Sequence, residues 1–264
     1  NSLIAETGTL RKNILCFHKL TNNFTYGSTN YSPRRFSELL GSLIDTGHKF
    51  VPLNELNSDN GQSQAAITFD DGYAHLIDTL PRLLEKYALV PTIFMPTEFI
   101  GKTNAWDYNS FLKPERHLDK TQITELAAMG VEFGSHGHSH FDLTRCSAAT
   151  LKEELHKSKS IVEEIIGKPI DTLSYPFGRF NTDTVISVKD AGYMRALTMR
   201  FPNEDDSNFM LGRIPVYFFD HPAFIKQKLK NGRMHSVHKN LNRFINEISH
   251  GTTIFNRFTG RNKN

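Results

Sequence analysis

Reactive side chains stand directly after three apolar runs of this 264-residue chain. The run "AAITF" is followed by the adjacent carboxylates Asp70 and Asp71, and "VEFGS" is followed by His136, His138 and His140. A third run, "TLSY", leads into a Pro-Phe-Gly turn. In a parallel α/β barrel, chemistry takes place where strands have ended and helices have not yet begun. The three places are therefore candidates for one shared site.

These carboxylates and imidazoles match the needs of a metal-dependent hydrolase. Two imidazoles and one carboxylate form a ligand set that leaves a position open for water on zinc, iron or cobalt. Such a metal lowers the pKa of its water to about 7, and a second carboxylate can then accept the water's proton. Because neighbouring side chains of a strand point to opposite faces, Asp70 and Asp71 are expected to differ in role, one ligand and one base.

Two simpler interpretations compete with a metal site. Asp-Gly is a frequent surface turn, so Asp70-Asp71-Gly72 could be a solvated turn after a strand. The histidines could be chance members of an exposed loop in a chain that holds 12 of them. The metal site is favoured because both groups, together with the Pro-Phe-Gly turn, fall at the ends of predicted strands.

Short apolar runs alternate with longer helical patterns along the chain. One helix is predicted with Ser32 as its N-cap, Pro33 in its first turn and Gly47 after its end, and Pro81 is expected to kink or restart a second helix. Strands are expected over residues 13–18, 49–53, 65–69, 90–96, 131–135, 170–178, 193–199 and 212–218. Helices are expected over residues 32–47, 74–89, 120–130, 147–167, 182–192, 222–230 and 241–248.

This alternation predicts one α/β domain. Seven or so βα units with helices of this length indicate a parallel sheet, open or closed into a barrel, of seven or eight strands. A chain of 264 residues is an ordinary length for a single α/β barrel. We therefore expect a single domain over residues 1–264, with a basic helical extension from about residue 222.

The net charge of +3 is distributed unevenly along the chain. Residues 221–264 carry nine Lys or Arg and one acid, a balance of +8, whereas the remainder carries −5. Such a tail could favour an anionic polymer or a membrane surface, but a solvated face without a partner explains it as well. No nucleic-acid-binding motif accompanies it, and no apolar run reaches the roughly eighteen residues of a membrane span. Neither a nucleic-acid partner nor a transmembrane segment is expected.

Taken together, "TFDDGY", "GSHGHSHFDL" and "SYPFG" resemble the motifs of the polysaccharide deacetylases, the NodB-homology family. The resemblance runs from about residue 14 to about residue 216 and implies a distorted (β/α) barrel. It also implies one divalent metal, usually zinc, held by Asp71, His136 and His140. Asp70 takes the place of the family's catalytic base, and His138 falls between two ligand positions without being a ligand.

The sequence departs from the family pattern at two places. The family's third motif begins with an Arg that steadies the catalytic Asp, but Ser174 stands there, and Arg213 in "LGRIPV" could supply the missing charge. The family's C-terminal Leu-x-x-His motif has no good copy after Val216. The stretch "LCFH", however, places His18 in that spacing near the N-terminus, an arrangement similar to the permuted poly-N-acetylglucosamine deacetylases. His18 is thus the expected general acid, and the looser candidates are His221, His235, His238 and His250.

Further residues are expected on the substrate side of the site. The backbone N–H of Phe177 matches the family position that helps to hold the oxyanion, and Tyr175 belongs to the same motif. Trp106, the only Trp, stands in a loop after a predicted strand. It could stack on a sugar ring or anchor the loop.

The resemblance implies a hydrolase that removes N-acetyl groups from an N-acetylated amino-sugar polysaccharide or glycoconjugate. Its partner would be that glycan, and its place would be outside the cytoplasm or at the cell envelope of a bacterium. Two alternatives stay open. One is a hydrolase of another amide or ester on the same scaffold. The other is a catalytically weak or silent glycan-binding domain, which the missing Arg at Ser174 would suit.

Overall fold

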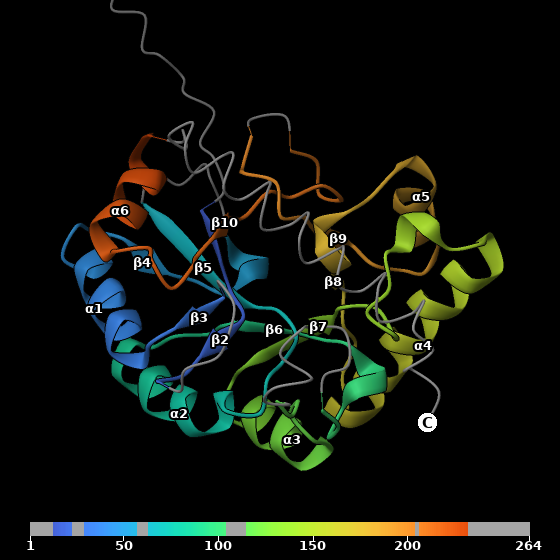
Figure 1. The fold of residues 1–264 in the computed structure, drawn as a ribbon, viewed down its shortest axis with the longest axis horizontal. Helices are drawn as coiled ribbons and strands as arrows, with labels where there is room; N and C mark the ends of the chain where they lie inside the picture. The colour runs from blue at the N-terminus through green and yellow to red at the C-terminus, as the bar shows by residue number, and fades with distance from the viewer. Residues whose placement is uncertain (1–12, 23–28, 57–62, 104–114, 204–205, 232–264) are drawn as a thin grey trace, which may run out of the picture.

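The computed structural model describes residues 13–22, 29–56, 63–103, 115–203 and 206–231 (Figure 1). Its centre is a parallel sheet with the strand order β10-β1-β5-β6-β7-β8-β9, and β4 pairs with β5 beside this path. The strands are β1 (Ile14–Phe17), β4 (Lys49–Phe50), β5 (Gln64–Phe69), β6 (Thr92–Met95), β7 (Glu132–Ser135), β8 (Thr172–Ser174), β9 (Arg195–Leu197) and β10 (Ile214–Pro215). A second, small parallel sheet of β2 (Lys19–Leu20) and β3 (Asn30–Tyr31) was not predicted. The expected α/β fold is confirmed.

Helices line the outer side of the curled sheet in the described part of the chain (Figure 1). They are α1 (Pro33–Ile44), α2 (Leu76–Tyr87), α3 (Lys120–Ala128), α4 (Ala148–Ile166), α5 (Thr182–Asp190) and α6 (Pro222–Asn231). The predicted N-cap of α1 is present, since the Ser32 side chain accepts the N–H of Arg35. One helix, α2, runs through Pro81 and does not restart there. The helix expected over residues 241–248 lies outside the described residues.

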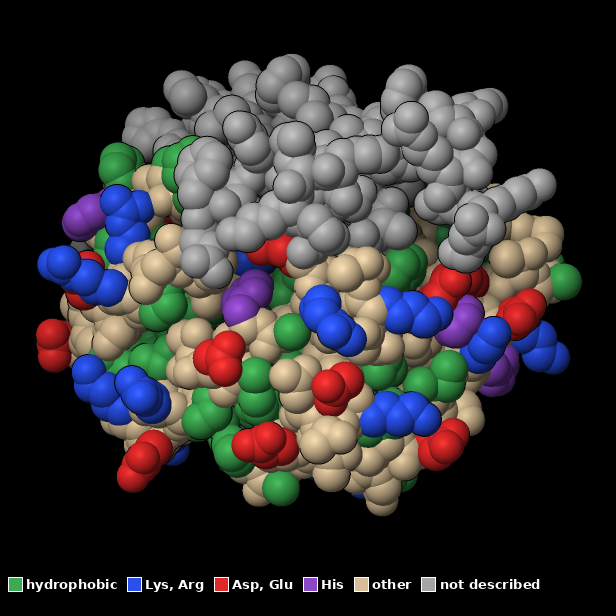
Figure 2. Space-filling view, turned by 60° about the horizontal axis from the view of Figure 1, so that its bottom comes forward, with side chains coloured by type: hydrophobic (Ala, Val, Ile, Leu, Met, Phe, Trp, Pro, Cys, Tyr) green, Lys and Arg blue, Asp and Glu red, His purple; other side chains and the backbone are tan. Residues whose placement is uncertain are grey.

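Among the described helices, none combines the length and apolar character that a membrane crossing requires. Figure 2 shows one face of the molecule, on which Lys and Arg side chains are interspersed with Asp and Glu. The described residues visible on that face therefore form no continuous basic surface. Most of the basic tail follows residue 231 and lies outside the described residues, so its role stays a prediction.

Alternation along the strands divides the core into two layers. Leu15 of β1 and Ile67 of β5 belong to a large apolar cluster that also contains the buried faces of the helices. Their neighbours Ile14 and Ala66 belong to a smaller cluster on the inner side of the sheet, because successive side chains of a strand point to opposite faces. By the same alternation Asp70, four residues after Ala66, emerges on the inner side at the end of β5.

One segment late in the chain joins the two edges of the sheet. Leu211 forms an isolated parallel bridge with Leu197 of β9. Three residues later, Ile214 of β10 pairs with Leu15 of β1. The short stretch between these pairings carries Arg213, whose side chain is completely buried. Closure of the sheet thereby brings a cation from the C-terminal part of the fold to its inner side.

Candidate active site

The carboxyl ends of neighbouring parallel strands carry the predicted residues to one edge of the sheet. Asp70 and Asp71 follow β5, and His136 follows β7, two strands away. The N–H of His136 donates to the carbonyl of Met95 at the end of β6, which fixes the level of the histidine loop against the sheet. Asp71, His136 and His140 are all buried, and their possible ligand atoms lie within 4.8 Å of one another.

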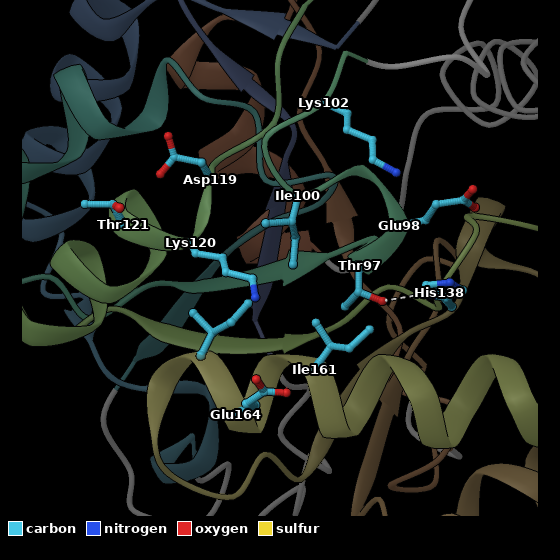
Figure 3. A pocket seen from close by; sticks show the side chains of 11 residues that line it. Thr97, Glu98, Ile100, Lys102, Asp119, Lys120, Thr121, His138, Ile161 and Glu164 are labelled. Atoms are coloured by element: carbon cyan, nitrogen blue, oxygen red, sulfur yellow. Dashed lines mark hydrogen bonds between the residues drawn. The ribbon is translucent and has the colours of Figure 1, made fainter. Parts of the chain in front are cut away.

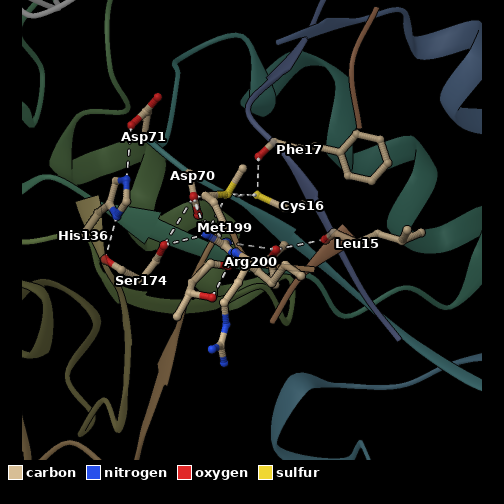
Figure 4. Close-up of polar contacts among 12 residues, drawn as sticks. Leu15, Cys16, Phe17, Asp70, Asp71, His136, Ser174, Met199 and Arg200 are labelled. Atoms are coloured by element: carbon tan, nitrogen blue, oxygen red, sulfur yellow. Dashed lines mark hydrogen bonds and ion pairs between the residues drawn. The ribbon is translucent and has the colours of Figure 1, made fainter. Parts of the chain in front are cut away.

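The two imidazoles aim their Nε2 atoms at the carboxylate. Oδ1 of Asp71 lies 3.3 Å from Nε2 of His140 and 3.5 Å from Nε2 of His136 (Figure 4 draws the second contact). Nδ1 of His136 lies 2.8 Å from the carbonyl oxygen of Ser174 and must donate, since a carbonyl only accepts. Burial lowers the pKa of His136 to about 4, so at neutral pH this imidazole is neutral and its Nε2 carries a lone pair.

This arrangement fits a divalent cation. Oδ1 of Asp71 is buried and has no hydrogen-bond partner among the described residues. A carboxylate oxygen that faces the lone pair of His136 is repelled by it unless a cation or a proton lies between them. One carboxylate and two imidazoles also form a protein ligand set that leaves zinc an open position. The donor set therefore suits the metal that the sequence implies.

Backbone strain is concentrated around the same residues. Asp71 (φ 67°), His140 (φ 51°) and Phe177 (φ 59°) are three of the four non-glycine residues with positive φ in the described ranges. Each such conformation costs about 1 kcal/mol or more and persists only where the surrounding structure fixes it. Asp71 thereby leaves the alternation of β5, and both it and Asp70 interact electrostatically with His136. The expected placement of the two acids on opposite faces does not apply once the strand has ended.

Arg213 forms a bidentate ion pair with Asp70. Nη1 donates to Oδ1 and Nη2 donates to Oδ2, each at 2.7 Å, and the two side chains are 0% and 2% exposed. Nη2 also donates to Oγ of Ser174 at 2.8 Å. This hydroxyl lies 3.2 Å from Oδ2 of Asp70 (Figure 4 labels Ser174 and Asp70). Burial alone would raise the pKa of Asp70, but Arg213 and the nearby imidazoles lower it to about 2. The carboxylate is therefore ionised at neutral pH, and a guanidinium contacts both of its oxygens although the motif has Ser174 in place of Arg.

His18 lies beside the two acids. In the pairing of β1 with β5, Phe17 is opposite Phe69, so the next residues, His18 and Asp70, leave the sheet at the same level. A charged His18 lowers the pKa of both acids, and its Nδ1 is buried with no hydrogen-bond partner in the described part of the chain. Of the looser candidates, His221 is exposed just before α6, and the other three lie outside the described residues.

The predicted substrate-side residues are placed differently from one another. Phe177 lies in the short helix η5 (Pro176–Gly178), with its ring edge-on to His140 at a centroid distance of 4.8 Å. The side chain of Tyr175 is 0% exposed, and its hydroxyl donates to the carbonyl of Phe209 at 3.1 Å. This side chain is part of the buried core beside the site, and its expected role toward substrate stays a prediction. Trp106 lies outside the described residues.

Glu154 of α4 holds the histidine loop, and the sequence patterns did not single it out. Its Oε2 accepts the N–H groups of His138 and Ser139 at 2.9 Å each, and its Oε1 accepts the hydroxyl of Ser139 at 2.6 Å. The available signal was its position on the buried face of α4, between the inward-facing Leu151 and Ser158. An acid at such a position needs partners, because an unpaired buried charge is costly.

A separate cavity of about 670 Å³ adjoins the histidine loop between α3 and α4 (Figure 3). His138 and Thr97 contribute to its wall and are joined by a 2.8 Å hydrogen bond between Nδ1 of His138 and Oγ1 of Thr97. Lys102, Lys120 and Glu164 also line it, and none of the three metal-ligand candidates does. The side chain of His138 thus belongs to this cavity rather than to the ligand cluster.

Known proteins are similar to this chain in sequence and in fold. The family described as Polysaccharide deacetylase matches residues 57–196, a segment that contains both acids and the histidine loop but neither His18 nor Arg213. The Putative polysaccharide deacetylase YxkH of Bacillus subtilis is 26% identical over 211 residues, which cover 77% of this chain and 70% of the relative. The Poly-beta-1,6-N-acetyl-D-glucosamine N-deacetylase of Staphylococcus aureus is 26% identical over 211 residues, 70% of each chain.

Solved structures extend this similarity to the fold. The Streptococcus pyogenes deacetylase PplD in complex with acetate has a TM-score of 0.70 at 20% identity, and the match covers 83% of this chain and 98% of that chain. At this identity the match bears on the fold alone. It agrees with the curled parallel sheet and its outer helices.

Proposed function

Because the chain belongs to the polysaccharide deacetylase family, we propose that it is a metal-dependent hydrolase that removes N-acetyl groups from an N-acetylated amino-sugar polysaccharide or glycoconjugate. The observation that carries the proposal is the buried Oδ1 of Asp71, which faces the Nε2 atoms of His136 and His140. A second carboxylate, Asp70, is kept ionised beside them. A ligand set and a base thus occupy one edge of the sheet.

Asp71, His136 and His140 are the proposed ligands of one divalent metal, and a carboxylate with two imidazoles suits zinc. When bound, the metal would supply Lewis-acid chemistry, lowering the pKa of water to about 7 and polarising the amide carbonyl. His136 is oriented for this by the hydrogen bond from its Nδ1 to the carbonyl of Ser174. Such outer contacts fix the tautomer of a ligating imidazole.

The remaining residues divide the proton transfers between them. Asp70 takes a proton from the attacking water, and the guanidinium of Arg213 holds its carboxylate in place. The backbone N–H of Phe177 donates to the oxygen on which negative charge develops. His18 gives a proton to the departing nitrogen as the carbon–nitrogen bond breaks. The products are acetate and a sugar with a free amine.

We propose a polymer of N-acetylglucosamine as the substrate. The support is the similarity to the staphylococcal Poly-beta-1,6-N-acetyl-D-glucosamine N-deacetylase over 70% of this chain. The position of His18 near the N-terminus agrees with the permuted arrangement of the deacetylases that act on such polymers. Since a long polysaccharide does not cross a membrane unaided, we place the activity at the bacterial cell envelope.

The structure weakens the case for a silent glycan-binding domain. That alternative rested on the Arg missing at Ser174, which would leave Asp70 without a partner. Arg213 contacts both oxygens of Asp70 and also donates to the hydroxyl of Ser174. A guanidinium therefore reaches the acid from another segment, which supports the proposal of a hydrolase over that of a binding domain.

The test is acetate release by the purified chain from poly-N-acetylglucosamine, chitin oligomers and peptidoglycan. We expect release from at least one glycan, abolition by a chelator and recovery with added zinc. Asp70→Asn should abolish release while the protein still retains metal by elemental analysis. Glycan binding without acetate release would support a binding domain, and turnover of esters alone would support another hydrolase. Activity that survives in Asp70→Asn would remove Asp70 from the role of base.

A further inference from the structure

Outside the family motifs, we propose that His117 is a positioning residue that holds the metal ligand Asp71 in its left-handed backbone conformation. The inference rests on the proposed metal site. His117 precedes α3 and lies 46 residues after Asp71 in the sequence. Only the folded chain brings the two together.

The contact is direct, short and buried. Nδ1 of His117 lies 2.6 Å from the backbone carbonyl oxygen of Asp71, and His117 is 1% exposed. A carbonyl oxygen has no proton to give, so Nδ1 carries the hydrogen and donates it. Water does not compete at this depth, which makes the bond costly to lose.

The imidazole of His117 is fixed from two sides. The backbone N–H of His117 donates to the carbonyl of Lys102. The backbone N–H of the next residue, Leu118, donates to the carbonyl of Gly72 at 2.8 Å. The ring stacks on Tyr73 at a centroid distance of 4.9 Å and an interplanar angle of 24°. The segment around His117 is therefore bound to the residues that directly follow Asp71, and the donor cannot drift away from its acceptor.

The bond matters because of where the strain lies. Asp71 (φ 67°) and Gly72 (φ 56°) are consecutive residues in the left-handed region. For a residue with a side chain this conformation costs roughly 1 to 3 kcal/mol. Relaxation of Asp71 to an extended conformation would turn its carbonyl away from His117 and move its carboxylate away from His136. By holding the carbonyl, His117 keeps Oδ1 of Asp71 in the ligand cluster.

Two substitutions separate the donor from the ring. His117→Phe keeps a ring that can stack on Tyr73 but removes the donor. His117→Asn removes the ring but keeps an N–H at the position of Nδ1, attached to the same side-chain carbon. We would load both variants and the parent protein with Co²⁺ and measure affinity by chelator competition, visible absorption spectra and melting temperature. Loss of an outer contact of a metal ligand typically weakens affinity 10- to 100-fold.

We expect His117→Phe to bind Co²⁺ at least about tenfold more weakly, with an altered spectrum, and His117→Asn to stay within about threefold of the parent. If His117→Phe does not fold, His117→Gln replaces it, because its amide lies one methylene too far to reach the carbonyl in the same way. The inference would be overturned if all three proteins bound Co²⁺ with equal affinity. It would also be overturned if both variants lost the same affinity and this loss matched only their fall in melting temperature. A parent protein that binds no Co²⁺ would instead refute the proposed metal site.

Discussion

Arg213 and Asp70 form a buried bidentate ion pair that joins segments 143 residues apart in the sequence. The guanidinium reaches Asp70 from the stretch that links the two edge strands, not from the motif in which the family carries its Arg. The pair keeps Asp70, the proposed base, ionised and fixes both of its oxygens. Loss of either the charge or the bidentate geometry is therefore expected to lower activity.

Arg213→Lys should lower kcat/KM by about tenfold to a hundredfold, because an ammonium keeps the charge but cannot donate to both oxygens in parallel. Arg213→Ala should cost more and also destabilise the fold by about 3 to 5 kcal/mol, since it leaves Asp70 buried without its partner. Acetate release and urea unfolding measure the two effects. Parent-like activity in Arg213→Ala would show that Asp70 needs no guanidinium.

Glu154→Ala should weaken zinc affinity by roughly tenfold or more, because three donors of the histidine loop lose their acceptor. Glu153→Ala is the matched control on the same helix, since the Glu153 side chain is 70% exposed and lies 3.9 Å from Lys157. Isothermal titration with zinc compares the two. Similar affinities in both variants would mean that the loop holds its shape without Glu154.

Gly72→Ala should destabilise the protein by about 2 to 4 kcal/mol. Its φ of 56° strains any side chain, and an added Cβ would overlap Sδ of the buried Met95. Gly47→Ala isolates the strain, because Gly47 has φ 84° but nothing within 4 Å of an added Cβ, and should cost only about 1 kcal/mol. Urea unfolding of both variants measures the two losses in the free energy of unfolding. The prediction would be wrong if Gly47→Ala lost as much stability as Gly72→Ala.

The low pKa of the buried His75 predicts that the protein loses stability in acid. Burial, assisted by the charge of Lys19, lowers its pKa from 6.5 to about 3, and its Nε2 accepts the N–H of Leu20. Between these pKa values the unfolded chain binds the extra proton, so the contribution of neutral His75 is present above pH 6.5 and is lost as the pH falls toward 3. The loss should reach about 1 to 2 kcal/mol at pH 5.

The control for this effect is His75→Gln, which keeps an acceptor for Leu20 but does not titrate. Its free energy of unfolding should fall less steeply than that of the parent between pH 7 and pH 5. Both proteins have the same residues at the proposed metal site, so the difference between the two slopes isolates His75. Identical slopes would mean that His75 takes up its proton in the folded protein as readily as in the unfolded chain.

The sequence by itself determined the elements and the motif residues. Continuous apolar runs predicted β1 and β5, and Ser32 followed by Pro33 predicted the start of α1, because these signals act over a few neighbouring residues. The spacing within "SHGHSH" marked the histidines as a candidate ligand group, and the resemblance to a known family selected His136 and His140 among them. Each of these patterns can be recognised within a few neighbouring residues, without knowledge of the rest of the fold.

The tertiary structure decided which distant side chains complete the site. The sequence offered Arg213 for the missing charge only through its place at a predicted strand start, and it did not single out His117 or Glu154. The contacts of Arg213 with Asp70 and of His117 with Asp71 span 143 and 46 residues. They depend on strand register, on closure of the sheet and on the left-handed turn at Asp71. None of these is encoded in the spacing of a motif, since each follows from how separate elements pack.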